Sequence, residues 1–347
     1  MVIKFLKANN GDSIHISSGN KNILIDTGTG ATYFSKSNGR SKNGELKSLV
    51  NDLQSKNEKI DLLIITHWDD DHIGGVLKWF KEDLENAKSM IKHIWFNSGL
   101  LLNKYFESCK ASGDKTILSS HQNPNTSIRQ GITFEKYILD EDISYSLIKT
   151  DSDDLNNILD GAIFTILSPT DKELEKLLVK WEQEYNPNTS ASNKDYDKSF
   201  EELLQNELKE DTAIHNGSSI AFILEIEDKK MLFLGDAHPS VVVDSLINLE
   251  YSKENKLSLD LIKVSHHGSK ANISDELLDI IECDNFVIST DGSKHGLPNK
   301  ETVARIIKKH ENCKIYFNYP DLINQIFTED ELTNNNFKTL DANELSL

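Results

Sequence analysis

The chain has 347 residues, enough for one large α/β domain with insertions or for two smaller domains. Its formal net charge of −18 argues against general electrostatic binding of nucleic acid. An enzyme could still bind phosphates at a metal site surrounded by a few basic residues. Three cysteines without a Cys-x-x-Cys pair indicate reduced thiols rather than a disulfide framework. Without a signal peptide or a membrane-length apolar run, we expect a soluble, cytoplasmic protein with no membrane partner.

The first residues alternate apolar and polar side chains, which predicts three strands at residues 2–6, 13–16 and 22–26. The third strand ends in Asp26, whose carboxylate could bind a metal or hydrogen-bond backbone beside one; we favour the second role. Residues 31–44 have the composition of a loop and form a locally basic stretch. An amphipathic helix is then predicted over residues 45–56.

Ligand-type side chains gather directly after the apolar run at residues 62–65, which reads as a buried strand. Four of them follow within six residues: His67, Asp69, Asp71 and His72. Imidazole and carboxylate together suit zinc or manganese, and the two glycines that follow let a helix, expected at residues 76–90, start close to the strand. The competing interpretation is an acidic surface turn with two histidines, and we favour the metal site.

The middle of the chain is harder to interpret. Strands are predicted at residues 91–97, 143–147 and 162–167, whereas the stretch between the first two has no clear pattern. Residues 170–214 are rich in acidic and amide side chains, with helical patterns at 171–184 and 200–210. We expect this segment to be an acidic, partly helical surface insertion within a single domain of residues 1–347, and it could dock a protein partner.

Three later strands also end in ligand-type residues. The strand at residues 231–234 leads to Asp236, the strand at 259–264 leads to His266 and His267, and the strand at 285–289 opens towards His295. Polar residues at several strand ends are how α/β enzymes assemble active sites. The set holds more ligands than one zinc needs, and a bridging carboxylate would suit two ions. After residue 317 we expect only a polar tail.

Taken in order, these motifs resemble the metallo-β-lactamase superfamily of hydrolases, whose signature is His-x-His-x-Asp-His after a strand. More narrowly, they resemble soluble relatives of the β-lactamase-like domain of ComEC-type DNA-uptake proteins. The resemblance is carried by Gly11-Asp12-Ser13, Leu24-Ile25-Asp26-Thr27-Gly28, the segment Thr66–Gly75, Asn216-Gly217-Ser218-Ser219-Ile220, Leu234-Gly235-Asp236 and the segment Lys263–Lys270. It implies an αββα sandwich with two divalent metal ions at one edge, between the sheets.

The resemblance also implies roles for the individual residues. His67, Asp69 and one of the pair His266/His267 would hold the first metal; Asp71, His72 and His295 would hold the second, and Asp236 would bridge them. Asp69 stands where the wider superfamily has a histidine, and this added carboxylate favours manganese over zinc. The superfamily's mid-chain ligand has only His93, His121 and His215 as candidates, none of them in a motif.

For catalysis, the resemblance implies a hydroxide that bridges the two metals and is oriented by Asp71. The second histidine of the pair, here His267, with Ser269 and Lys270, would contact the phosphate or protonate the leaving group. Lys263, Lys270 and Lys294 would supply local positive charge.

Three functions fit this pattern. The first is a phosphodiesterase or nuclease acting on nucleic acid or another phosphodiester. The second is a hydrolase of a small molecule such as a nucleotide, phosphoester, lactone or lactam. The third is a metal-containing protein-interaction subunit. An open basic groove would favour the first, and a narrow pocket closed by residues 98–215 the second.

Overall fold

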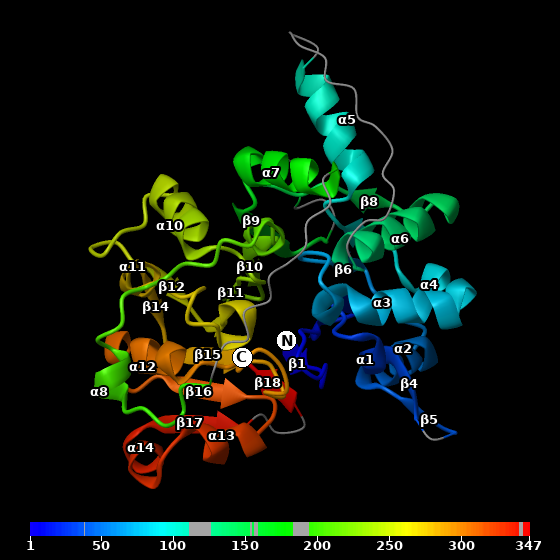
Figure 1. Ribbon diagram of the computed structural model, residues 1–347. Coiled ribbons are helices and arrows are strands. Elements are labelled where there is room, and N and C mark those ends of the chain that lie inside the picture. The colour runs from blue at the N-terminus through cyan, green and yellow to red at the C-terminus, as the bar shows by residue number, and fades with distance from the viewer. Residues whose placement is uncertain (38, 111–125, 153–154, 156–158, 183–193, 340–342) are drawn as a thin grey trace.

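The structure, a computed structural model, describes residues 1–37, 39–110, 126–152, 155, 159–182, 194–339 and 343–347. Within these residues, two seven-stranded β-sheets are stacked, with helices on the outer side of each (Figure 1). The αββα sandwich expected from the resemblance is therefore confirmed. No helix in the described part of the chain is long and apolar enough to span a membrane.

The first sheet has the strand order β18-β1-β2-β3-β6-β7-β8. Its strands are antiparallel from β18 to β3 and parallel from β3 to β8. Their bounds are β1 (Val2–Phe5), β2 (Ile14–Ser18), β3 (Lys21–Ile25), β6 (Leu62–Ile64), β7 (Ile94–Trp95), β8 (Tyr145–Ser146) and β18 (Glu344–Ser346).

The second sheet has the order β17-β16-β15-β13-β11-β10-β9, antiparallel from β9 to β11 and parallel beyond. Its strands are β9 (Ala162–Ser168), β10 (Ala221–Ile226), β11 (Lys229–Phe233), β13 (Leu261–Lys263), β15 (Asn285–Ile288), β16 (Lys314–Phe317) and β17 (Asn336–Thr339). Two small sheets pair β4 (Phe34–Ser37) with β5 (Arg40–Asn43), and β12 (Leu257–Leu259) with β14 (Ile281–Cys283).

Helices on the outer side of the first sheet bury one apolar face each against it. They are α1 (Gly30–Tyr33), α2 (Glu45–Ser55), α3 (Asp70–Glu82), α4 (Leu84–Met90), α5 (Gly99–Lys110), α6 (Thr126–Asp140) and α7 (Asp171–Glu182). The second sheet is accompanied by α10 (Pro239–Asn248), α11 (Asp275–Ile280), α12 (Lys300–Lys309), α13 (Asp321–Ile326) and α14 (Glu329–Asn334). Shorter turns are α8 (Phe200–Leu203), α9 (Ile214–Gly217) and the 3₁₀ turn Ser265–Gly268.

The core between the sheets is built from the inward side chains of both. Trp95 of β7 contacts Phe164 of β9 and Phe222 of β10, with ring centroids 4.7 and 6.4 Å apart. Alternation along each strand sends one set of side chains into this core and the other under the helices. Because both faces are packed, the strand ends are rigid supports for the loops that follow them.

Four sequence predictions differ from the structure. Helix α3 begins at Asp70, inside the ligand motif, and not at residue 76 as predicted. Gly74 and Gly75 lie within the helix and let it pack closely, because a Cβ at Gly75 would lie 2.0 Å from the Thr27 carbonyl oxygen. The predicted loop over residues 31–44 contains α1 and the β4–β5 hairpin. The predicted polar tail adds β17 and β18, one strand to each sheet. The single strand predicted at 259–264 is two, β12 and β13.

The segment at residues 170–214 is anchored at both ends rather than confined to the surface. Leu174 and Leu177 of α7 belong to the core under the first sheet. Asp195 is buried and accepts hydrogen bonds from the backbone N–H groups of Lys300 and Glu301, at 2.9 and 3.2 Å, at the start of α12. Between these anchors, residues 183–193 lie outside the described part of the chain.

Candidate metal centre

The first ligand group follows β6 and opens helix α3. Asp69 occupies the N-cap position of α3, where an aspartate side chain normally accepts a backbone N–H. Its carboxylate makes no capping bond; instead, Oδ2 lies 3.0 Å from Nε2 of His215. Asp71 and His72 lie in the first turn of the same helix. The start of α3 is thus shaped to present side chains to the site at the expense of its own cap.

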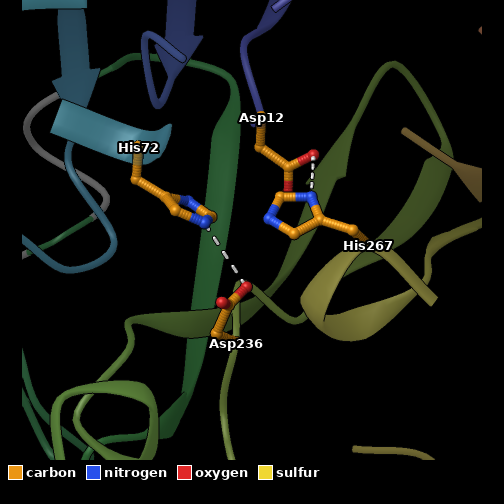
Figure 2. A group of neighbouring side chains, drawn as sticks. All are labelled: Asp12, His72, Asp236 and His267. Carbon is orange, nitrogen blue, oxygen red and sulfur yellow. Dashed lines mark ion pairs between the residues drawn. The ribbon is translucent and has the colours of Figure 1, made fainter. Parts of the chain in front are cut away.

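Asp236 lies at the centre of the cluster, after β11. It is 3% exposed, and Figure 2 shows one of its oxygens facing His72. Oδ2 lies 3.6 Å from Nε2 of both His67 and His266, whereas Oδ1 lies 3.5 Å from Nε2 of His72. The fourth imidazole, His267, points its Nε2 at Asp71 Oδ2, 3.5 Å away. The cluster therefore has two halves joined by Asp236. His67, Asp69 and His266 form the first half, and Asp71, His72 and His267 form the second.

Consecutive left-handed residues bring His266 and His267 into these positions. Their φ angles are 46° and 54°, in a region that costs non-glycine residues free energy and that concentrates at functional sites. The resulting tight turn after β13 lets two adjacent imidazoles reach opposite halves of the cluster, instead of pointing to opposite sides as they would in a strand.

All four histidines use Nδ1 for a protein partner. Nδ1 of His72 lies 2.8 Å from Asp26 Oδ2, and that of His67 lies 3.1 Å from Ser219 Oγ. Nδ1 of His266 meets Asn272 Oδ1 at 2.9 Å, and Nδ1 of His267 meets the Ser289 carbonyl at 3.0 Å. Such contacts fix the ring and leave Nε2 as the ligand atom, as in known metal sites.

The ligand atoms themselves are buried and unsatisfied. Five of them have no hydrogen-bond partner: Nε2 of His67, His72 and His267, Oδ1 of Asp69 and Oδ1 of Asp236. Burying an unpaired polar atom costs about 1–3 kcal/mol, so five in one cluster are unfavourable unless something else binds them. Two ligands of one tetrahedral zinc lie about 3.4 Å apart at normal bond lengths. The observed separations of 3.5–3.6 Å to Asp236 fit that requirement.

The charges in the cluster are strongly coupled. Burial alone would raise the pKa of Asp236, but His266, His72 and His67 outweigh it and hold that pKa well below its usual range. Burial would lower the pKa of His72, yet Asp236 and Asp26 raise it well above the usual value. The carboxylate is thus ionised at neutral pH, the state that a metal ligand requires.

Asp26 has the supporting role expected from the sequence. It is 1% exposed and accepts hydrogen bonds from the Thr66 backbone N–H at 2.8 Å and the Thr66 hydroxyl at 2.7 Å, besides contacting His72. Asp26 therefore ties the end of β3 to the end of β6 and orients a ligand from there.

Asp12 is a member of the site that the sequence did not single out as such. Ligand atoms of Asp12, His72, Asp236 and His267 lie within 4.8 Å of one another (Figure 2). Asp12 Oδ1 lies 3.5 Å from Nδ1 of His267, the side of the ring away from Asp71, and Oδ2 accepts from Lys263 Nζ at 2.6 Å. This arrangement assigns Asp12 to orienting His267, and its only signal in the sequence was the Gly-Asp-Ser motif.

The Lys263–Asp12 pair is buried, with side-chain exposures of 2% and 3%. Lys263→Met leaves an unpaired buried carboxylate and should lower the free energy of unfolding by about 3–5 kcal/mol. Urea unfolding measures this loss. The matched control is Lys88→Met, which removes the exposed pair with Glu141 and should change stability little. Equal stability of the two variants would contradict this structural role.

Of the two mid-chain candidates that lie in the described residues, His93 and His215, His215 reaches the cluster. Besides its contact with Asp69, its Nδ1 lies 2.6 Å from Lys180 Nζ of α7. His93 uses both ring nitrogens on Ser144 and Ser146, at 2.7 and 2.9 Å. His121 lies outside the described residues. Helix α7 within the segment at 170–214 and helix α9 at its end thus place Lys180 and His215 next to Asp69 in the first half of the site.

Two predicted site residues lie elsewhere. His295 is exposed in a turn and, within the described residues, makes none of the contacts that join the other candidates. The place expected for it, beside Asp71 and His72, is taken by His267. Lys270 pairs with Glu301 at 3.2 Å, away from the ligand atoms. The sequence could not show either result, because both depend on the path of the loops after β13 and β15.

His295→Ala should therefore leave metal content and hydrolysis within about twofold of the parent, because an exposed side chain outside the cluster contributes little. Metal analysis and steady-state kinetics measure both quantities. Loss of one metal per chain would return His295 to the ligand set.

Comparisons with known proteins give one sequence match and several distant structural likenesses. The sequence model of the metallo-beta-lactamase superfamily matches residues 7–125. Three similar solved structures are the Zn²⁺-bound PqqB of Methylobacterium extorquens, the metallo-beta-lactamase fold protein YhfI of Bacillus subtilis and the short form of human tRNase Z. PqqB is 11% identical over 100% of both chains, with a TM-score of 0.45. YhfI is 11% identical over 98% of this chain and 97% of that one, with a TM-score of 0.40.

The human tRNase Z is 10% identical over 100% of this chain and 99% of that one, with a TM-score of 0.37. No curated protein sequence matches the chain. The matched superfamily model and the two stacked sheets together identify the metallo-β-lactamase fold.

Proposed function

We propose that the protein is a hydrolase of phosphodiesters that holds two divalent metal ions, zinc or manganese. The observation that supports this most directly is the set of buried, unpaired ligand atoms around Asp236. The first ion would be held by His67, Asp69 and His266, with His215 beside them. The second would be held by Asp71, His72 and His267, and Asp236 would serve both.

The donor set suits hard or borderline ions, because each half combines imidazole nitrogens with carboxylate oxygens. When bound, two such ions activate water and neutralise charge on a phosphate. The remaining chemistry falls to the chain's own side chains.

Asp71 would orient the attacking water. Its side chain is 22% exposed, so one edge of the carboxylate reaches solvent, while Oδ2 accepts from Asn10 Nδ2 at 2.9 Å. Burial would raise the pKa of Asp71, but the close contact with His267 and the charge of His72 lower it far below the usual range. Asp71 is therefore ionised at neutral pH, and its carboxylate can accept a hydrogen bond from that water.

The cation nearest the leaving group would be Lys180 rather than Lys270. Lys270 is engaged by Glu301, whereas Lys180 lies against His215 at the mouth of the first half. An ammonium group there could stabilise negative charge on a departing oxygen.

The test supplies bis-p-nitrophenyl phosphate, plasmid, single-stranded DNA and RNA to protein loaded with manganese or zinc. The matched control is the double variant Asp71→Ala/His72→Ala, which removes two ligands of one half. The proposal requires hydrolysis of at least one phosphodiester by the parent alone. Equal rates for the two proteins, or a metal content near zero after loading, would rule it out.

A small phosphodiester or other small molecule is the second candidate. Two of the lysines expected to supply positive charge for a nucleic acid have carboxylate partners: Lys263 is buried against Asp12, and Lys270 pairs with Glu301. Because their charge is offset, a small substrate is favoured. Hydrolysis of bis-p-nitrophenyl phosphate without cleavage of any nucleic acid would select this candidate over a nuclease.

A further inference from the structure

An unusual concentration of positive charge lies on the β4–β5 hairpin and its neighbours. Residues 27–44 contain no aspartate or glutamate, although the chain carries a net charge of −18. Lys36, Arg40 and Lys42 are exposed, and none of them has a carboxylate partner among the described residues. Elsewhere in this acidic protein many lysines are paired with carboxylates, so an unneutralised cluster indicates an anionic partner.

An aromatic ring lies at the centre of the cluster. The ammonium groups of Lys36, Lys47 and Lys78 lie 5.5, 5.2 and 5.9 Å from the centroid of the half-buried Phe34 ring. Only Lys78 has a carboxylate partner there, Glu82 at 2.9 Å. Glu82 offsets the charge of Lys78, whereas Lys36 and Lys47 are like charges at the same ring with no ion-pair carboxylate among the described residues, and an added anion would reduce their repulsion.

The hairpin register places two further cations on the face of the ribbon opposite this ring. Phe34 pairs with Asn43 and Lys36 with Ser41, so Phe34 and Lys36 share one face of the ribbon. Arg40 and Lys42 lie on the other face. Figure 1 shows the hairpin projecting from the body of the protein beside α1 and α2. A flexible polyanion could therefore contact both faces at the exposed edge.

The same elements lead to the metal centre. Helix α3 starts at Asp70, beside the ligands, and Lys78 follows eight residues later, about 12 Å along the helix axis. Helix α1, which precedes the hairpin, packs against α3, where a Cβ at Gly30 would lie 3.7 Å from the Gly74 carbonyl oxygen. A strand with one phosphate per roughly 3.4 Å spans such a distance with a few nucleotides.

We infer that Phe34, Lys36, Arg40, Lys42, Lys47 and Lys78 form a binding site for single-stranded nucleic acid, here named the hairpin site. It rests on the proposed function, whose active centre would cleave the bound strand. Cations contact the phosphates, and the Phe34 ring stacks on a base. A single strand fits better than a duplex because its bases are free to stack on an aromatic side chain.

The experiment measures binding of a labelled 30-nucleotide single strand by fluorescence anisotropy, with metal-loaded protein in an Asp71→Ala background to prevent cleavage. The test variant is Lys36→Glu/Arg40→Glu/Lys42→Glu. The matched control is Lys256→Glu/Lys308→Glu/Lys314→Glu, which makes the same change in net charge at exposed, unpaired lysines elsewhere. Three lost contacts should flatten the slope of log K against log salt by about 2 and weaken binding about 100-fold at 0.1 M salt.

A second variant, Phe34→Leu, keeps every charge and should weaken binding about tenfold through lost stacking, without changing the salt slope. Equal binding by the test and control triple variants would overturn the hairpin site, as would a parent that binds anionic vesicles or duplex DNA but no single strand. Hydrolysis of bis-p-nitrophenyl phosphate by the variants in the active background is measured separately. If the parent does not hydrolyse bis-p-nitrophenyl phosphate, the proposed active centre is refuted. If the parent hydrolyses it but the test triple variant binds the strand as tightly as the control, only the hairpin site is refuted.

Discussion

Replacing Asp236 by asparagine is expected to lower phosphodiester hydrolysis about 1,000-fold or more, because a bridging carboxylate supports several kcal/mol of transition-state stabilisation. The two oxygens of Asp236 face the two halves of the cluster. Asparagine keeps the size of the side chain but removes its charge and one acceptor. The variant should therefore bind less metal while keeping the fold, and metal analysis beside kinetics measures both effects.

The matched control for Asp236→Asn is Asp211→Asn, which changes a carboxylate in the layer behind the ligands. Asp211 Oδ2 lies 3.5 Å from Nδ1 of His266 and accepts from Asn216 Nδ2 at 2.6 Å. A residue that orients a ligand typically changes metal affinity or activity by about 10–100-fold. An Asp236→Asn protein with the metal content and the rate of the parent would refute the two-half arrangement.

The motif after β6 could be predicted from sequence because all its ligands are local. His67, Asp69, Asp71 and His72 follow one strand within six residues, and a strand end followed by a helix start must bring them together. Asp236 and the histidine pair could also be placed, since each follows a buried strand. The strands themselves were predictable from apolar runs, whereas β17 and β18 were not, because edge strands with polar sequence lack that pattern.

What sequence could not give was the division of labour inside the cluster. The choice between His266 and His267 depends on two left-handed backbone angles, which no side-chain pattern encodes. The structure brings both histidines to the cluster, one to each half. Asp12 lies 55 positions before His67, and His215 lies 21 positions before Asp236, so only the folded sheets show their proximity to the site. For the same reason, the sequence could not show that Lys263 and Lys270, expected to supply local positive charge, are paired with carboxylates, because those partners are distant in sequence.

Removal of metal should lower stability strongly, because the empty cluster holds unpaired buried atoms. Binding to the folded state alone stabilises it by about 4 kcal/mol per ion when the free metal is 1,000 times its Kd. Thermal unfolding of chelator-treated protein, with and without added manganese or zinc, measures the gain as a rise in Tm. The His295→Ala variant should show the full rise, and Asp236→Asn much less. A Tm that is indifferent to metal in the parent would contradict the proposed centre.

The rise in Tm on adding metal should also depend on pH, and the direction of this dependence follows from the protonation of His267. Burial would lower its pKa, but Asp12 and Asp71 raise it to about 10 in the metal-free protein. A protonated His267 stabilises the metal-free fold fully below the unfolded pKa of about 6.5, and this contribution is lost as the pH rises towards 10. Metal requires the neutral ring and must displace that proton. The rise in Tm on adding metal should therefore be larger at about pH 9 than at about pH 6, and the opposite trend would show that His267 is not a ligand.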